Sequence, residues 1–343
     1  MSVYSALLWT VLAVAPVNDE IVLVAVGDVM LARGVGEKIR RCGTEHPFSD
    51  VARVLESADV GFCNLECVLA DEARPQSNGF VFKANPILAH TLRHAGFDLV
   101  SVANNHTLDC GTAGFRETIR ILRHSGIIPI LAEPIVKKVR GIRLGLCAFN
   151  LVGRHQTSEV MIRAVKELEA TSDVVIVSLH WGIEYTLSPS TQQLRLAKQL
   201  VDSGADLILG HHSHRVQGIG SYKDRFIVYS LGNFLFDQRD PLGNETVMLL
   251  IKLTRAGVRR ITIVPAVIVN FRPERAFNKL GHAILARLID SSARLNTQVV
   301  KVFHEGMVLG RIYPFQEEMD VERIADIAWR NHVRRISKNS TRF

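Results

Sequence analysis

"DLILGHHSH", residues 206–214, runs from an aspartate through a short apolar segment into three histidines within four positions. An apolar run of this length that ends in polar residues is typical of a strand buried on both faces. The same pattern recurs upstream in "ESADVGFCNLE" (56–66), "HAGFDLVSVANNH" (94–106) and "ATSDVVIVSLHWG" (170–182). It also appears in "IVLVAVGDVM" (21–30) and "RFIVYSLGNFLFD" (225–237). Buried strands that end in polar clusters therefore predict a sheet with its candidate functional residues along one edge.

The segments between these strands are long enough for helices. Helices are predicted at 86–95, 114–125, 158–170 and 190–203, and "SPSTQQ" (188–193) supplies an N-cap before the last of them. Apolar strands that alternate with helices indicate an α/β fold made of βαβ units. In open α/β sheets, ligands bind at the carboxyl ends of the strands.

The polar clusters supply ligands for a metal ion. We expect one crevice to collect the residues at the strand ends, namely Asp28, Glu66, Asn105, His106, His180, His212 and His214. His212 and His214 are two positions apart, so in an extended segment both imidazoles project to the same side and can reach one metal site. His211 points the other way and is the weaker candidate for a metal ligand. Its expected place is next to the ligands, where it would support them.

Composition excludes several classes of protein. The chain has 343 residues, 47% of them hydrophobic and 22% charged, which is typical of a globular protein with one large or two ordinary domains. Five cysteines without CxxC spacing argue against a disulfide scaffold. The sequence also has no serine elbow, P-loop or complete G-x-G-x-x-G pattern. The formal charge of +7 suits an anionic partner, but no nucleic-acid module accompanies it, and no nucleic-acid partner is expected.

Three regions are predicted along the chain. Residues 1–20 form an apolar segment, too short to span a bilayer comfortably, which is expected to be a tail, a packed helix or a weak anchor. Residues 21–270 form the catalytic domain. Residues 271–343 form a helical extension with a basic tail, with helices expected at 274–296 and 319–336. The expected location is cytoplasmic or peripheral to a membrane.

Seven motifs in order resemble the CapA family of capsule or poly-γ-glutamate synthesis proteins, which is related to calcineurin-like metallophosphoesterases. They are "GDVMLAR" (27–33), "NLE" (64–66), "FKANP" (82–86), "VANNHTLDCG" (102–111), "LHWGIEY" (179–185), "GHHSHRVQ" (210–217) and "SLGNFLFD" (230–237). The resemblance implies a metallophosphatase-like fold, a four-layer α/β/β/α sandwich of two mixed sheets. It also implies one or two divalent metal ions at the strand ends, with manganese, zinc, iron, cobalt and nickel as candidates.

The resemblance implies a role for each residue of the crevice. Asn105, His180 and His212 would hold one metal, Asp28 and His214 the other, and His106 would act on the substrate as general acid or base. Two departures stand out, because Met30 occupies the position of a metallophosphatase histidine, and "NLE" offers Asn64 and Glu66 where a bridging aspartate is expected. The predicted metal ligands are thus Asp28, Glu66, Asn105, His180, His212 and His214, and the predicted catalytic residues are His106, Glu66 and Asp28.

The residues predicted to bind substrate surround these ligands: Arg33, Asn64, Lys83, Asn104, Trp181, Glu184, Tyr185, His211 and Asn233. The expected reaction is hydrolysis of a phosphoester, or of an amide in a poly-γ-glutamate-type peptide, by a metal-activated water. Two alternatives remain open. A metal-dependent peptide epimerase would abstract a proton next to a polarised carbonyl, and a non-catalytic scaffold would serve capsule assembly or export. The expected partners are an anionic or peptide substrate and capsule-synthesis proteins, with membrane association as a further alternative.

Overall fold

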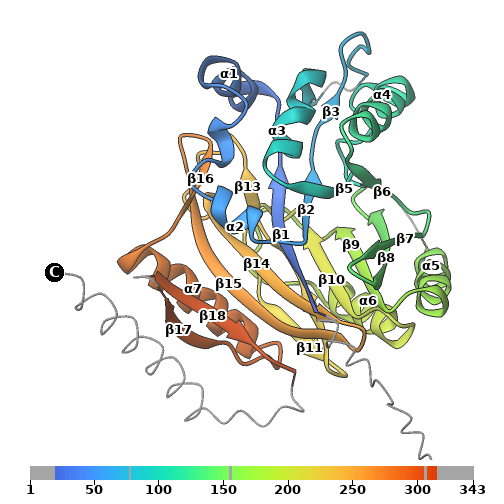
Figure 1. The fold of residues 1–343 in the computed structure, drawn as a ribbon, viewed down its shortest axis with the longest axis vertical. Helices are drawn as coiled ribbons and strands as arrows, with labels where there is room; N and C mark the ends of the chain where they lie inside the picture. The colour runs from blue at the N-terminus through green and yellow to red at the C-terminus, as the bar shows by residue number, and fades with distance from the viewer. Residues whose placement is uncertain (1–19, 77–78, 154–156, 305–306, 315–343) are drawn as a thin grey trace, which may run out of the picture.

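The opening strand, β1 (Ile21–Val29), lies near the middle of the first sheet (Figure 1). The structure, a computed structural model, describes residues 20–76, 79–153, 157–304 and 307–314. In these residues the first sheet has ten strands, with the order β17-β18-β15-β14-β1-β2-β5-β6, while β13 pairs with β1 and β16 with β15. Their bounds are β2 Val60–Leu65, β5 Phe97–Ser101, β6 Ile128–Ile130, β13 Asn233–Leu235, β14 Glu245–Thr254, β15 Gly257–Val269, β16 Arg272–Arg275, β17 Val300–His304 and β18 Met307–Ile312.

The second sheet has six strands in the described residues, in the order β11-β12-β10-β9-β8-β7. Their bounds are β7 Ile135–Val139, β8 Ile142–Asn150, β9 Val174–His180, β10 Leu207–His211, β11 Ile219–Tyr222 and β12 Arg225–Val228. The central strands of both sheets are parallel, whereas β14, β7 and β11 join their sheets in antiparallel pairs. Both sheets are therefore mixed, as predicted.

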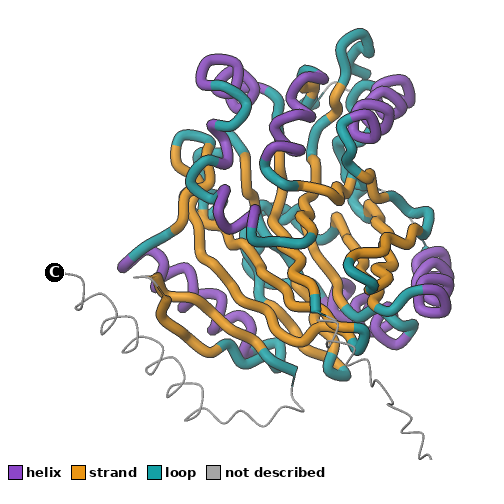
Figure 2. The backbone as a smooth tube through the Cα atoms, viewed as in Figure 1, coloured by secondary structure: helices purple, strands orange, loops and turns teal. Residues whose placement is uncertain are grey.

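The alternation of side chains along the strands produces the layers. In β2, Val60 and Phe62 belong to the core between the two sheets, whereas Cys63 and Leu65 face the outer core of the first sheet. β9 does the same in the second sheet, because alternate residues face the shared core and an outer core beneath α5 and α6. Helices thus cover both outer faces, as Figure 2 shows. The predicted four-layer α/β/β/α sandwich is confirmed.

The helices lie close to their predicted positions. The segments expected at 86–95, 114–125, 158–170 and 190–203 correspond to η2 (Pro86–Leu88) with α3 (Ala89–His94), α4 (Gly111–His124), α5 (Ser158–Thr171) and α6 (Thr191–Asp202). At α6 the predicted cap is present as a full capping box between Ser190 and Gln193. The outer layer of the first sheet also contains α1 (Arg33–Cys42), η1 (His46–Phe48) and α2 (Ala52–Glu56), and β3 (Val68–Leu69) pairs with β4 (Lys83–Ala84).

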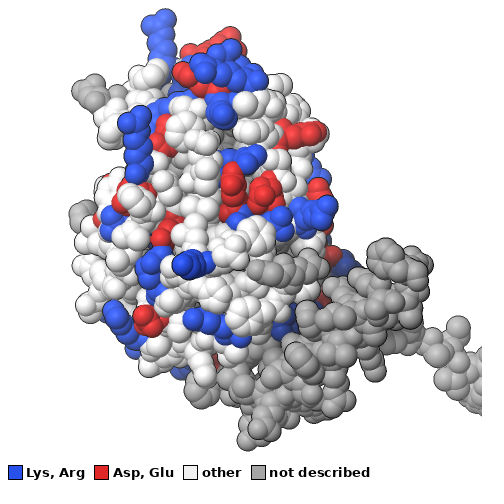
Figure 3. Space-filling model, turned by 90° about the vertical axis from the view of Figure 1, so that its left-hand side faces the viewer, with Lys and Arg blue, Asp and Glu red and all other residues white. Residues whose placement is uncertain are grey.

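The C-terminal region differs from the predicted helical extension. α7 (Asn278–Ala293) lies within the expected helix 274–296, but β16, β17 and β18 add strands to the first sheet. Figure 3 shows this side of the molecule, where acidic and basic side chains are interspersed among uncharged ones. The apolar segment up to residue 19 and the helix expected at 319–336 lie outside the described residues. Among the described residues, no helix has the length and apolar composition that crossing a bilayer requires.

Candidate metal site

The carboxyl ends of strands from both sheets meet at one edge of the sandwich. In the first sheet, the parallel register places Asp28 of β1 beside Asn64 of β2, and Asn64 beside Ser101 of β5. In the second sheet, His180 at the end of β9 is paired with His211 at the end of β10. The loops that follow these strands carry the remaining polar residues, Glu66, Asn104, Asn105, His106, His212 and His214.

A glycine lets β1 approach the segment before β13 closely enough to place Asp28. A Cβ atom on Gly27 would lie 1.9 Å from the carbonyl oxygen of Gly232, a distance that no side chain tolerates. The backbone N–H of Asp28 donates to this same carbonyl at 2.9 Å. Glycine at position 27 is therefore a condition for the position of the Asp28 carboxylate.

Four non-glycine residues around the site have left-handed backbone conformations: Arg33 (φ 51°), Tyr185 (φ 60°), His212 (φ 91°) and His214 (φ 56°). Such conformations cost on the order of 1–3 kcal/mol each and are kept where the surrounding structure imposes them, often at functional sites. At His212 and His214 they turn the chain sharply after β10. The two rings lie with their centroids 6.1 Å apart.

Glu66 lies at the centre of the histidines. Its Oε1 atom is 3.8 Å from His106 Nε2, 3.9 Å from His180 Nε2 and 4.0 Å from His214 Nε2. Donors that bind one ion at about 2.1 Å lie no more than about 4.2 Å apart, so each of these spacings is compatible with a shared ion. Asp28, Glu66 and His180 together offer three ligand atoms within 4.8 Å of one another.

The Glu66 carboxylate is fully buried, and neither of its oxygens has a hydrogen-bond partner within the described residues. Burial raises the pKa of Glu66 well above its ordinary value, and the nearby Asp28 raises it further. A buried carboxylate without partners is costly unless a cation compensates it. This observation fits a divalent ion at Glu66.

Asp28 is buried as well, but its environment favours the charged form. Asn64 donates to Asp28 Oδ1 at 2.9 Å, and His211 Nδ1 lies 3.0 Å from the same oxygen. Burial alone would raise the pKa of Asp28, yet the hydrogen bond with the adjacent His211 ring holds this pKa below its ordinary value. Asp28 is thus a ready anionic ligand.

Two histidines of the site are neutral at physiological pH. Burial lowers the pKa of His180 well below its ordinary value and that of His212 to about 4. Metals bind the neutral imidazole, whose nitrogen keeps a lone pair. His212 Nδ1 is buried and has no hydrogen-bond partner in the described residues, while His180 Nε2 lies 2.7 Å from Asn105 Oδ1. These donors also suit a divalent ion.

His106 is held from two directions. Its Nδ1 atom lies 2.9 Å from Asp109 Oδ2, and the ring of Phe82 stacks on the imidazole with centroids 3.9 Å apart. The same Asp109 oxygen accepts the backbone N–H of Phe82 at 2.7 Å. With Nδ1 engaged by a carboxylate, Nε2 is the nitrogen that faces Glu66. Asp109 was not among the predicted site residues, although its position three residues after His106 in "NNHTLD" was a usable signal.

Some of the predicted substrate residues lie at the rim of the site. Arg33 is paired with Asp237, and its guanidinium lies 4.6 Å from the centre of the Phe82 ring. Tyr185 is 45% exposed, and its ring lies 5.8 Å from that of His214. Glu184 is exposed in the same loop, and Lys83 donates to the backbone carbonyl of Asp71.

Other predicted substrate residues are buried behind the ligands. Asn64 and Asn104 hydrogen-bond to each other at 3.2 Å, and Asn233 accepts from His214 Nδ1 at 2.9 Å. Trp181 donates its indole N–H to the carbonyl of Tyr229 in the outer core of the second sheet. Asn64, Asn233 and His211, which is 1% exposed, contact the candidate ligands Asp28 and His214 from behind. We do not assign these residues, Asn104 or Trp181 to substrate contact.

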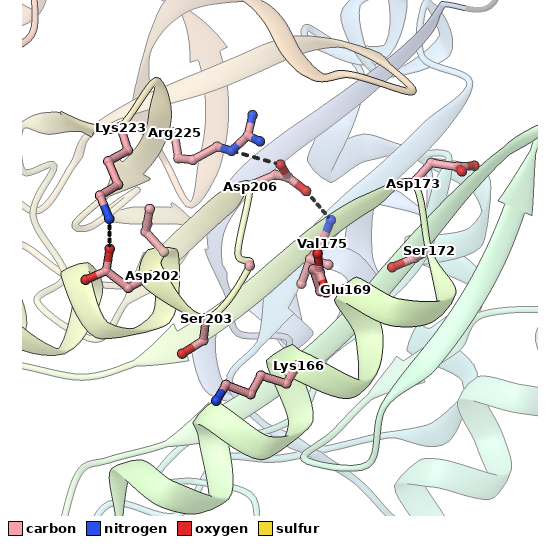
Figure 4. Close-up of a pocket in the computed structure, with 12 residues that line it drawn as sticks. Lys166, Glu169, Ser172, Asp173, Val175, Asp202, Ser203, Asp206, Lys223 and Arg225 are labelled. Atoms are coloured by element: carbon pink, nitrogen blue, oxygen red, sulfur yellow. Dashed lines mark hydrogen bonds and ion pairs between the residues drawn. The ribbon is translucent and has the colours of Figure 1, made fainter.

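A cavity that is not part of the candidate metal site lies at the opposite end of the second sheet. It has a volume of about 750 Å³ and opens between α5, α6 and the first residues of β9 (Figure 4). Its charged side chains are mostly paired with one another, as Lys223 is with Asp202 at 2.6 Å and Arg225 with Asp206 at 3.1 Å. This cavity is therefore separate from the carboxyl-end site.

Comparison with known proteins identifies relatives of the chain. The family model of the bacterial capsule synthesis protein PGA_cap matches residues 22–238. The capsule biosynthesis protein CapA of Bacillus anthracis is 31% identical over 286 residues, which cover 74% of this chain and 70% of the relative. The PGA biosynthesis protein CapA of Bacillus subtilis (strain 168) is 26% identical over 264 residues, covering 70% of each chain. The predicted family is confirmed.

Solved structures resemble this chain more distantly. The crystal structure of a hypothetical protein from Thermus thermophilus is 17% identical, with a TM-score of 0.46. It covers 74% of this chain, which in turn covers 96% of that structure.

Proposed function

The chain belongs to the family of the bacterial capsule synthesis protein PGA_cap, and on this premise we propose that it is a metal-dependent hydrolase of acidic, polyglutamate-type peptides. The relatives named for capsule and PGA biosynthesis suggest this substrate class. The chemistry of the carboxyl-end site suggests the reaction. A substrate of this kind is anionic, which agrees with the formal charge of +7.

The observation that carries the proposal is the buried Glu66 carboxylate, which has no hydrogen-bond partner among the described residues and has three imidazole nitrogens within 4.0 Å. The proposed metal ligands are Asp28, Glu66, Asn105, His180, His212 and His214. A divalent ion bound by them would supply Lewis-acid polarisation of a carbonyl and a water of lowered pKa.

His106 is the proposed general acid and base. Asp109 accepts the proton of Nδ1, so that Nε2 faces the reacting groups and can accept a proton from water or donate one to the leaving amine. The Phe82 ring against one face of the imidazole limits its rotation. Arg33, Glu184 and Tyr185 at the rim are the proposed substrate contacts.

The test is hydrolysis of γ-linked glutamyl peptides by protein supplied with manganese, zinc, iron, cobalt or nickel. Glu66→Gln should lower kcat/KM by more than the 10–100-fold that removing a partner of a metal ligand typically costs. The matched control is Glu72→Gln, because Glu72 is exposed and is neither a proposed ligand nor a proposed substrate contact, and it should leave kcat/KM unchanged.

The same assay separates the other reactions. Cleavage of phosphoesters but not of peptides would replace the substrate class and keep the metal chemistry. Exchange of solvent deuterium into an uncleaved peptide would indicate epimerisation. Full support of capsule assembly by Glu66→Gln protein would show that the chain acts as a scaffold and would contradict the proposal.

A further inference from the structure

The outer face of α4 forms a groove that is basic and has an apolar floor. The groove has a volume of about 400 Å³. Its floor consists of Phe115, Ile119 and Leu131, which are partly buried against the outer core of the first sheet. The other residues that line it are basic, namely Arg116, Arg120, Arg123 and His124. No acidic side chain of the described residues lines this groove.

The three arginines of α4 lack the partners that many other arginines of the protein have. Arg93 is paired with Asp98 at 2.7 Å and Arg143 with Asp173 at 2.9 Å. Eight more arginines pair with a carboxylate: Arg33, Arg41, Arg140, Arg215, Arg225, Arg272, Arg275 and Arg287. No ion pair joins the α4 arginines to another described residue. The neighbouring Glu117 accepts the backbone N–H of Asp71 instead.

The spacing of these arginines matches an extended chain. Arg116, Arg120 and Arg123 are four and three residues apart, so they lie on one face of the helix. At a rise of about 1.5 Å per residue, successive arginines are displaced by roughly 4.5–6 Å along the helix axis. Alternate side chains of an extended peptide repeat at roughly 6.5 Å on one side, close to this spacing.

We propose that this groove is a second binding site, which takes the carboxylate side chains of an acidic peptide in extended conformation. Charge complementarity supports this occupant, because every charged group on the rim is basic. The methylene groups of the peptide would cover the apolar floor. An anionic membrane fits less well, because Phe115, Ile119 and Leu131 are recessed rather than protruding.

The inference goes beyond the proposed function, because binding on α4 requires no metal. α4 begins at Gly111, two residues after Asp109, and the groove begins at Phe115, about one turn further along this helix. A long acidic chain held on α4 would raise the local concentration of its other segments at the metal site.

The test is fluorescence anisotropy of a fluorescein-labelled α-linked hexaglutamate, whose carboxylate side chains have the repeat argued above, with the full chain in EDTA. The variant carries Arg116→Gln, Arg120→Gln and Arg123→Gln together, and glutamine preserves helix propensity. We expect its Kd to be about tenfold higher than that of wild type, because three charge contacts are lost. The matched control carries Arg40→Gln, Arg163→Gln and Arg195→Gln, which remove the same charge from exposed positions on other helices. Its Kd should stay within about twofold of wild type, since distant charges are screened.

Three outcomes would overturn the inference: equal weakening by both triple variants, no weakening by the α4 variant, or loss of peptide binding in Glu66→Gln protein. Cosedimentation with vesicles of equal parts phosphatidylcholine and phosphatidylglycerol tests the membrane as occupant. Binding to these vesicles that depends on the α4 arginines, without peptide binding, would also overturn it. Failure of the proposed function would give a different result. The wild-type protein would then bind no metal and hydrolyse no peptide, but would still bind the acidic peptide through α4.

Discussion

At the scale of single residues, the contribution of Asp109 to the state of His106 can be tested. Asp109→Asn keeps the shape of the side chain but removes the charge that holds the Nδ1 proton of His106. The amide can present its N–H₂ group to Nδ1 and so favour the wrong tautomer. We expect kcat to fall by about 10²–10⁴-fold, the typical contribution of a general acid or base, while the metal content stays unchanged.

Asp98→Asn is the matched control for this prediction. Asp98 pairs with Arg93 at the surface of β5, away from the metal ligands, and its substitution should leave kcat unaltered. A pH–rate profile distinguishes an effect on His106 from a loss of structure. A change in the protonation of His106 shifts the profile along the pH axis, whereas partial unfolding lowers the rate equally at every pH. An Asp109→Asn enzyme with wild-type kcat and an unshifted profile would rule out the role of Asp109.

The site residues that the sequence could predict are those that end a buried strand. Asp28, Glu66, His180 and His212 follow or end apolar runs, and the topology brings them together. The direction in which a side chain points is harder to predict than its position at the end of a strand. Trp181 follows His180 directly, so the alternation of a strand sends the indole to the opposite face, where it packs on Tyr229. An amide such as Asn233 can face substrate or support a ligand, and only the fold shows that it supports His214.

At the scale of elements, Gly27 determines the position of β1. Gly27→Ala would force β1 away from Gly232, because the added Cβ atom would meet the carbonyl oxygen at 1.9 Å. Overpacking of this kind typically costs about 1–3 kcal/mol. We expect urea unfolding to show this loss and metal titration to show weaker binding, since Asp28 moves with the strand. Gly79→Ala is the control, because nothing lies within 4 Å of the added atom. Equal stability of the two variants would contradict this role.

The cap of α6 offers a second prediction at this scale. The Ser190 side chain accepts the backbone N–H of Gln193, so Ser190→Ala should lower the free energy of unfolding by about 1 kcal/mol. Ser188→Ala, which changes an exposed serine just before the cap, should have no such effect. Urea denaturation of both variants makes the comparison. A loss of metal binding on Ser190→Ala would show that the cap acts on the site and not only on the helix.

Helices and strands could be predicted from the sequence where hydrophobic pattern and capping residues indicated the same element. Apolar runs and caps located the central strands and the helices α4, α5 and α6, because burial and hydrogen bonding there depend on neighbouring residues. The C-terminal strands β16, β17 and β18 were missed. Their sequences alternate less clearly, and β17 has the burial of an edge strand, with Phe303 70% exposed. The pairing that makes them strands is tertiary, with β18 joining β15.

For the whole molecule, the proposed metal ligands come from both sheets, with Asp28 and Glu66 from the first and His180, His212 and His214 from the second. An ion bound only in the folded state stabilises the protein by RT ln(1 + [L]/Kd), about 2.7 kcal/mol at a hundredfold excess over Kd. We therefore expect Tm to rise when manganese or zinc is added and to fall in EDTA. In metal-free protein, Glu66→Gln should not lower Tm, because it removes a buried carboxylate without partners. A Tm that is insensitive to every metal would refute this coupling.

The central claim is that a buried carboxylate and the surrounding imidazoles, delivered by two sheets, share a divalent ion. Elemental analysis of protein loaded with metal and then passed through a desalting column tests it most directly. The account predicts one or two equivalents of a divalent metal per wild-type chain and a clear loss in Glu66→Gln protein. Wild-type protein that retains no metal under any loading condition, or Glu66→Gln protein that retains as much as wild type, would contradict it.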